Sequence, residues 1–167
     1  IAAAAAPASA NEEQTEATLD ELAGTYRNAA DDRNRRARNT AIGKVVDEMN
    51  FLVRGIARGR LKDANPVDRR ITIDRRGDRL TTSFDGRSYS ATLGGPGRVV
   101  EGITGDELRL TFRVQGDRLV QRFDGGDKGR QNVFELADDG HLRLSITVWA
   151  DRLPSNVRYE LRYEPVD

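Results

Sequence analysis

The chain has 167 residues, and its 27 basic side chains balance its 27 acidic ones, so the formal net charge is zero. A balanced surface argues against a dedicated nucleic-acid-binding protein, which needs a net basic face. The absence of cysteine excludes disulfides and thiolate sites, and a single histidine, His141, excludes a metal site built from several histidines. We therefore expect no metal and no cofactor.

The N-terminal residues, IAAAAAPASA, are rich in alanine, and Ala8-Ser9-Ala10 fits the small-x-small pattern of a signal-peptide cleavage site. A flexible Ala/Pro linker is the other interpretation. Both favour export, to the periplasm or outside the cell. We expect residues 1–18 to be a flexible arm that contacts a protein partner, with Ala2, Ala3 and Ala4 as interface candidates. No stretch of the sequence has the apolar length of a membrane span.

Residues 19–167 are expected to form one domain, with a short strand at 24–27 and a helical insert at 28–62. The apolar positions of the insert are spaced alternately by four and three residues, which places them on one helix face; they are Ile42, Val46, Met49, Val53 and Ile56. We expect this face to be buried against the sheet. Glycines within the insert weaken the helix, so one helix and two helices both stay open.

Nine short strands are predicted after the insert, at 69–75, 78–85, 87–93, 98–104, 107–114, 117–124, 130–137, 141–150 and 156–164. A Gly-Asp-X-Leu phrase recurs between them, at Gly77, Gly105 and Gly116, and glycine and aspartate suit tight hairpins. Apolar and polar residues alternate in several strands, which indicates one buried and one solvated face. The expected fold is mainly β, with one long helical segment: an antiparallel up-and-down meander closed into a barrel of about nine to ten strands.

Two short motifs and the order of the elements resemble a known family. Gly24-Thr25-Tyr26 resembles the Gly-x-Trp that opens the first strand of lipocalins, and residues 119–125 (LVQRFDG) resemble a late hairpin of the fatty-acid-binding proteins. The chain thus resembles the lipocalin-like (calycin) group. The resemblance implies barrel closure by Gly24 and Tyr26, with Arg158 or Arg162 packed beneath the tyrosine. The family's Arg-x-Tyr clamp near the C-terminus is absent, because here each arginine directly precedes a tyrosine and points to the opposite face.

Candidate ligand contacts are the side chains on the presumed inner face, namely Phe112, Gln121, Phe123, Tyr159 and Tyr163. The tyrosine hydroxyls either orient a polar ligand head or bond to backbone within a packed core. Gln121 is either a ligand contact or part of an internal network. No arginine falls unambiguously inside, so we expect a largely uncharged ligand. Trp149 is out of phase with its strand and is either exposed at an interface or covered by the helical segment.

The leading functional hypothesis is a non-enzymatic barrel that binds a small apolar molecule or acyl chain in the cell envelope. The alternative is an accessory subunit of a larger complex, either membrane-associated or not, which docks through its N-terminal arm and barrel surface while the helical segment fills the barrel. An isomerase or cyclase that works by cavity shape is a distant third. An apolar void of roughly several hundred Å³ favours the first hypothesis, and a filled interior favours the second.

Overall fold

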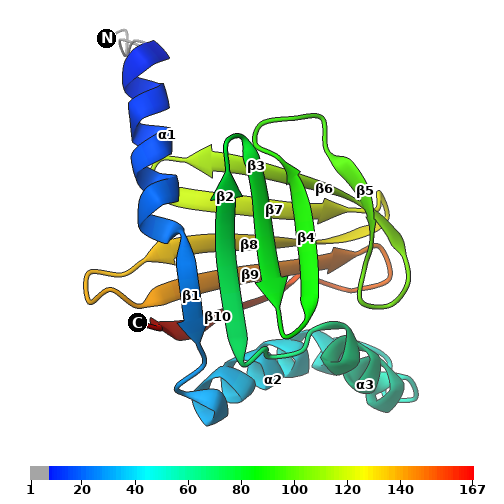
Figure 1. Cartoon of the computed structure of the whole chain (residues 1–167). Helices are drawn as coiled ribbons and strands as arrows, with labels where there is room; N and C mark the ends of the chain where they lie inside the picture. Colours follow the sequence, from blue (N-terminus) through cyan, green and yellow to red (C-terminus); the bar gives the residue numbers. More distant parts are fainter. Residues whose placement is uncertain (1–7) are drawn as a thin grey trace, which may run out of the picture.

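A computed structural model describes residues 8–167, which form three helices and ten strands (Figure 1). Helix α1 (Ala8–Leu22) leads into strand β1 (Gly24–Arg27), and helices α2 (Asp31–Asp47) and α3 (Arg54–Ala64) follow. The remaining strands are β2 (Arg70–Arg76), β3 (Arg79–Phe84), β4 (Arg87–Thr92), β5 (Arg98–Glu101), β6 (Glu107–Gln115), β7 (Arg118–Asp124), β8 (Lys128–Leu136), β9 (Leu142–Ala150) and β10 (Val157–Pro165). No helix in this part of the chain is both long and apolar enough to cross a membrane.

The ten strands form one antiparallel sheet in the order β4-β3-β2-β1-β10-β9-β8-β7-β6-β5. Strand β1 lies between β2 and β10 and thereby joins the start of the chain to its end. The two edge strands, β4 and β5, are not paired with each other. The residues after β4 instead reach β6, where the amide of Gly94 donates to the carbonyl of Phe112 at 2.9 Å. The predicted up-and-down barrel is confirmed, and it is nearly closed.

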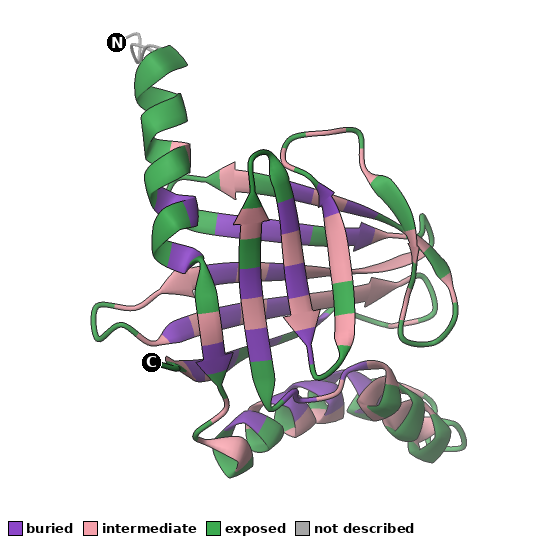
Figure 2. Cartoon of the chain, viewed as in Figure 1, coloured by how far each residue is buried: buried purple, intermediate pink, exposed green. Residues whose placement is uncertain are grey.

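The inner face of the barrel holds the apolar residues that alternate along each strand. Four of these residues have no more than 1% of their surface exposed, whereas their sequence neighbours are mostly more exposed; they are Leu110, Phe112, Leu119 and Phe134. Figure 2 shows this alternation of buried and exposed positions along the strands. Burial of one face of an antiparallel sheet is what a pattern of period two predicts.

Helix α1 closes one end of the barrel. Leu19 and Leu22 are 1% exposed, and the Thr18 hydroxyl donates to the carbonyl of Gly116 in the β6–β7 turn at 2.8 Å. Arg75 of β2 pairs with Glu16 of α1 at 2.5 Å. The helix therefore begins inside the arm expected over residues 1–18 and continues past its end, so the structure marks no boundary at residue 18. The interface candidates Ala2, Ala3 and Ala4 lie outside the described residues.

Helices α2 and α3 lie across the mouth at the other end of the barrel, which is at the bottom of Figure 1. Ile42 and Val46 of α2 are fully buried, but Val53 is 44% exposed and Ile56 61% exposed. The prediction of one continuous buried stripe is therefore wrong for Val53 and Ile56. The reason is a break between the helices, where the side chain of Asn50 accepts a hydrogen bond from the amide of Leu52 at 3.0 Å. After that turn, the spacing by four and three no longer continues the same face.

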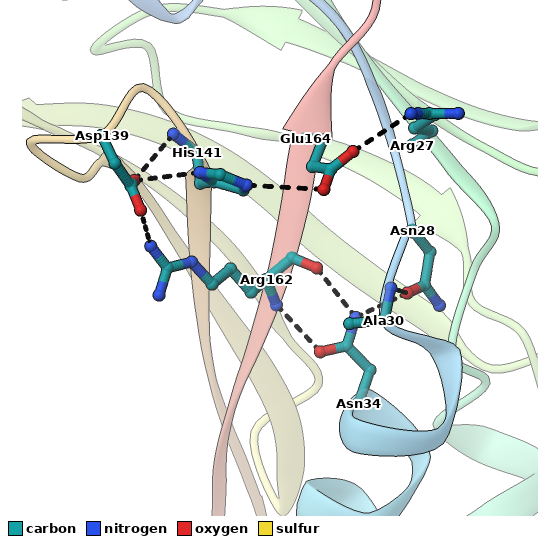
Figure 3. Close-up of polar contacts among 8 residues, drawn as sticks. All are labelled: Arg27, Asn28, Ala30, Asn34, Asp139, His141, Arg162 and Glu164. Atoms are coloured by element: carbon teal, nitrogen blue, oxygen red, sulfur yellow. Dashed lines mark hydrogen bonds and ion pairs between the residues drawn. The ribbon is translucent and has the colours of Figure 1, made fainter.

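A buried asparagine attaches α2 to β10 (Figure 3). The carboxamide of Asn34 accepts from the amide of Arg162 at 3.0 Å and donates to its carbonyl at 2.9 Å. It also donates to the side chain of Asn28, just before α2, at 2.8 Å. Asn34 is only 1% exposed, so these bonds satisfy polar groups that water does not reach. The contact fixes the helix pair over the mouth and so positions the site described next.

Candidate ligand-binding site

A cavity of about 240 Å³ lies at the end of the barrel that α3 covers. Its walls come from the last turn of α3, the β3–β4 hairpin, the β5–β6 loop, the β7–β8 hairpin and the β9–β10 turn. Apolar side chains make up most of the lining, and they include Leu61, Phe84, Tyr89, Leu108, Phe123 and Val148. The rings of Tyr89 and Phe123 meet edge to face, with 4.9 Å between their centroids. The cavity is thus an apolar space with aromatic walls.

At the floor of this cavity lies Asn132, which belongs to a row of three bonded polar side chains, Thr82, Gln121 and Asn132. We call this row the polar crossbar; Thr82 and Gln121 lie behind the cavity lining. The Gln121 amide donates to the Thr82 hydroxyl at 2.6 Å, and the Asn132 amide donates to the Gln121 side-chain oxygen at 2.9 Å. Strands β3 and β7, which carry Thr82 and Gln121, are not neighbours in the sheet, so this bond crosses the interior of the barrel. All three side chains are at most 2% exposed, and the hydrogen bonds satisfy their buried polar groups.

Below the polar crossbar the barrel is filled by side chains. Phe112, Gln121 and Asn132 are paired in register across β6, β7 and β8, and the next inward residues, Leu119 and Phe134, are 0% exposed. Neither of these two lines the cavity, whereas Asn132 does. The open space therefore occupies the half of the barrel nearest α3, and the half nearest α1 is packed core.

Four basic residues line the cavity, namely Arg87, Lys128, Arg130 and Arg152, and Arg87 and Arg130 bond to buried polar side chains. Arg130 points inward from β8, where its Nε donates to Asn132 at 2.9 Å and its Nη1 donates to the side chain of Asn65 at 2.8 Å. Arg87 pairs with the buried carboxylate of Asp68 at 2.7 Å, while its own Nε is buried and has no hydrogen-bond partner within residues 8–167. Burial raises the pKa of Asp68, and the Arg87 guanidinium acts against that rise.

The expectation of an inner face without arginine is therefore wrong. Arg130 shares the inward face of β8 with Asn132 and Phe134 because residues two apart point the same way. The sequence KGRQN at 128–132 is polar on both faces, so its alternation carries no signal of which face is buried. The next two residues, Val133 and Phe134, are both apolar, so they do not fix the register either.

The five predicted inner residues occupy different environments. Phe123 lines the cavity, whereas Phe112 and Gln121 are fully buried at or beneath its floor. The Tyr163 hydroxyl donates to the carbonyl of Asp68 at 3.0 Å, within the core. The Tyr159 side chain is 8% exposed, and its hydroxyl has no hydrogen-bond partner among the described residues. Burial raises the pKa of both tyrosines.

Trp149 lies at the rim of the cavity, on the edge of β9. Its ring covers Gly129 of the neighbouring strand, where a side chain would collide with it, and the guanidinium of Arg122 lies 4.3 Å from the ring centre. The residue is partly exposed and borders the cavity. It therefore belongs to the outer face at the mouth, which explains why it is out of phase with the inward residues of its strand.

The residues expected to close the barrel are arranged differently from the family pattern. The Tyr26 hydroxyl donates to the carbonyl of Leu22 at 2.9 Å, and Gly24 pairs with Ile73 of β2. Arg158 reaches Thr147 and Arg162 reaches Asp139, on the outer surface. Both arginines alternate with the inward residues of β10, so their side chains point away from Tyr26.

Comparison with known proteins identifies the fold. No protein-family model and no curated protein matches the sequence. A fatty-acid-binding protein from Schistosoma mansoni, solved in complex with arachidonic acid, has 13% identity and a TM-score of 0.54, with 90% of this chain and 99% of that chain covered. A fatty-acid-binding protein from the brain of Drosophila melanogaster has 20% identity and a TM-score of 0.54, with coverage of 86% and 98%. An abundant heat soluble protein from Ramazzottius varieornatus has 11% identity and a TM-score of 0.57, with coverage of 87% and 96%. Because the identities are this low, the likeness shows the fold alone: this chain has a nearly closed antiparallel barrel like that of the fatty-acid-binding proteins.

Proposed function

We propose that this protein binds a small, mainly apolar molecule in the cavity beneath α3, for carriage or sequestration and without chemical conversion. The observation that carries the proposal is the cavity itself: about 240 Å³, with a surface that is mainly apolar and aromatic and with Arg87 and Arg130 among its polar groups. Pockets for small molecules have this composition, since apolar walls supply affinity and a few polar groups fix orientation. The names of the structural neighbours, which include fatty-acid-binding proteins, support a ligand of this class.

The polar groups favour a ligand with a hydrogen-bond-accepting head, such as a carboxylate or a carbonyl. A guanidinium has five N–H donors, and the bonds of Arg130 to Asn132 and Asn65 use two of them. The buried Nε of Arg87 has no partner among the described residues, and an unpaired buried donor is unfavourable by about 1–3 kcal/mol. An acceptor on the ligand would satisfy such donors. This replaces the expectation of an uncharged ligand, which rested on an inner face without arginine.

The test is a titration with decanoate and with decanol, followed by calorimetry and by the fluorescence of Trp149, the only tryptophan, which lines the cavity. We expect both probes to change the fluorescence. Arg130→Gln should weaken the binding of decanoate by roughly ten- to a hundredfold, the range for a hydrogen bond to a charged group, and should weaken the binding of decanol less. Arg158→Gln is the matched control, because Arg158 is exposed on the outer face.

Two outcomes would count against the proposal. If neither probe produced binding heat or a change in fluorescence, the proposed binding function would be refuted. Equal weakening of decanoate by Arg130→Gln and Arg158→Gln would show that the arginine at the cavity has no special role. Melting curves of each variant show whether it remains folded, since Arg130 also bonds to Asn132 and Asn65.

A second candidate function is docking to another protein as an accessory subunit. It is favoured by the connection between α2 and α3, where Phe51 and Leu52 are each 73% exposed, and by the neighbouring Ile56 of α3, which is 61% exposed. Adjacent exposed apolar side chains of this size are typical of interaction surfaces. Phe51→Ser with Leu52→Ser should then reduce the size of the native complex in gel filtration of source extracts, without lowering the melting temperature. An export route, which the Ala-rich N-terminus favours, also stays a proposal, tested by cell fractionation.

A further inference from the structure

We propose that the polar crossbar of Thr82, Gln121 and Asn132 sets how deep a ligand can enter, so that the barrel binds compact molecules or medium-length acyl chains and gains nothing from longer ones. This inference rests on the proposed binding function and adds the size class of the ligand. It concerns the lower half of the barrel, between the crossbar and α1.

The crossbar resists displacement because its polar groups are buried and bonded to one another. The bond from Gln121 to Thr82 joins opposite walls at 2.6 Å, and the bond from Asn132 to Gln121 extends the row at 2.9 Å. Hydrocarbon that passed this level would have to break at least one of these bonds. The broken partners would then be buried against an apolar chain with no replacement, which is unfavourable.

The space beneath the crossbar is already occupied. Leu119 and Phe134 are 0% exposed, and Phe112, at the level of the crossbar itself, is 0% exposed as well. Leu19 and Leu22 of α1 close the end below them. Protein interiors are packed as densely as organic crystals, so these side chains cannot make room by small shifts.

The depth of the site follows from the strand β6. Leu108 lines the cavity, whereas Phe112, in the row of the crossbar, does not. The two are four residues apart, about 13 Å along a strand, which is the greatest depth that the site can have. An extended palmitate chain is longer than this. Whichever end of such a ligand enters first, its remaining methylenes stay at the mouth, where they are not buried.

The experiment is a binding series of saturated carboxylates from hexanoate through octanoate, decanoate and dodecanoate to palmitate, below their micelle concentrations. Each buried methylene should tighten Kd about fourfold. We expect that gain for the short members and less than a twofold gain between dodecanoate and palmitate. Burial of the four extra methylenes of palmitate would instead tighten Kd about 250-fold by the same increment.

Variants test whether the crossbar itself sets the limit. Gln121→Ala opens the floor and should move the plateau to a longer chain. Leu19→Ala is the control, because it removes side-chain volume at the closed end, away from the cavity, and should leave the plateau where it is. The assignment to the crossbar would be overturned if Leu19→Ala moved the plateau and Gln121→Ala left it unchanged.

The wild-type series decides the main point even where a variant fails to fold. A steady fourfold gain through palmitate overturns the depth limit but leaves the proposed binding function intact. No binding by any member of the series overturns the proposed function and the depth limit together. A plateau at medium length supports both.

Discussion

Replacing Gln121 with leucine tests whether the polar crossbar stabilises the fold as its geometry implies. Leucine has a similar size but cannot bond, so the substitution leaves the Thr82 hydroxyl and the Asn132 amide without their partner. Each buried group left unpaired is unfavourable by about 1–3 kcal/mol, which predicts a loss of about 2–6 kcal/mol for Gln121→Leu. Domains of this kind have a total unfolding free energy of about 5–15 kcal/mol, so the loss is measurable and large.

The assay is urea denaturation of Gln121→Leu, of Thr82→Val and of the double variant. Thr82→Val alone leaves one N–H donor of Gln121 without a partner and should lower the unfolding free energy by about 1–3 kcal/mol. The double variant should lose less unfolding free energy than the sum of the two single variants, because it leaves no Thr82 hydroxyl without a partner. Gln131→Leu is the matched control on the outer face of β8, with an expected change within about 0.5 kcal/mol.

Two results would refute this reasoning. One is a loss below about 1 kcal/mol for Gln121→Leu, which would mean that the crossbar is hydrated or not formed. The other is additivity of the two single substitutions within about 0.5 kcal/mol, the behaviour of independent sites. The urea m-value should stay constant across the set, since a changed m-value indicates a changed denatured state.

Three further predictions concern the helices, the rim and the ion pair. Ile42→Ala should lose about 2–5 kcal/mol in urea denaturation, whereas the exposed Ile56→Ala should stay within about 0.5 kcal/mol. Gly129→Ala should displace the tryptophan ring that covers this glycine, seen as a shift of its emission maximum, and an unchanged spectrum would contradict the stacking. Arg87→Gln removes the cation that opposes the effect of burial on Asp68, so NMR titration should find the pKa of Asp68 raised further. The stability lost in this variant should be largest above that pKa and should shrink as the pH falls through it, because the protonated carboxyl needs no counter-charge.

The sequence by itself determined the architecture. Strands β6, β9 and β10 were recognisable because apolar residues alternate along them, and this alternation depends only on neighbouring residues. The turns between strands carried glycine and aspartate, whose backbone preferences are equally local. The number of strands, their antiparallel order and the barrel they form could therefore be predicted, and the structure confirms them.

The helical segment shows where local patterns stop being sufficient. One helix face is predicted to hold Ile42, Val46, Met49, Val53 and Ile56. Only the first two are fully buried, and Met49 is partly buried against the core. A pattern with period 3.6 holds only while the helix continues, and the turn at Asn50 ends it. Whether the helix breaks depends on how α2 packs on the barrel, which a local pattern does not contain.

The cavity and its floor were decided by tertiary structure alone. Phe112 and Phe123 both point inward, but one is sealed in core and the other lines the cavity, since depth in the barrel depends on the register of strands far apart in sequence. For Gln121 the sequence left open a ligand contact or an internal network. Its partner Thr82 is 39 residues away, on a strand that is not its neighbour. Closure of the barrel brings these two side chains together, and no pattern within either strand specifies that meeting.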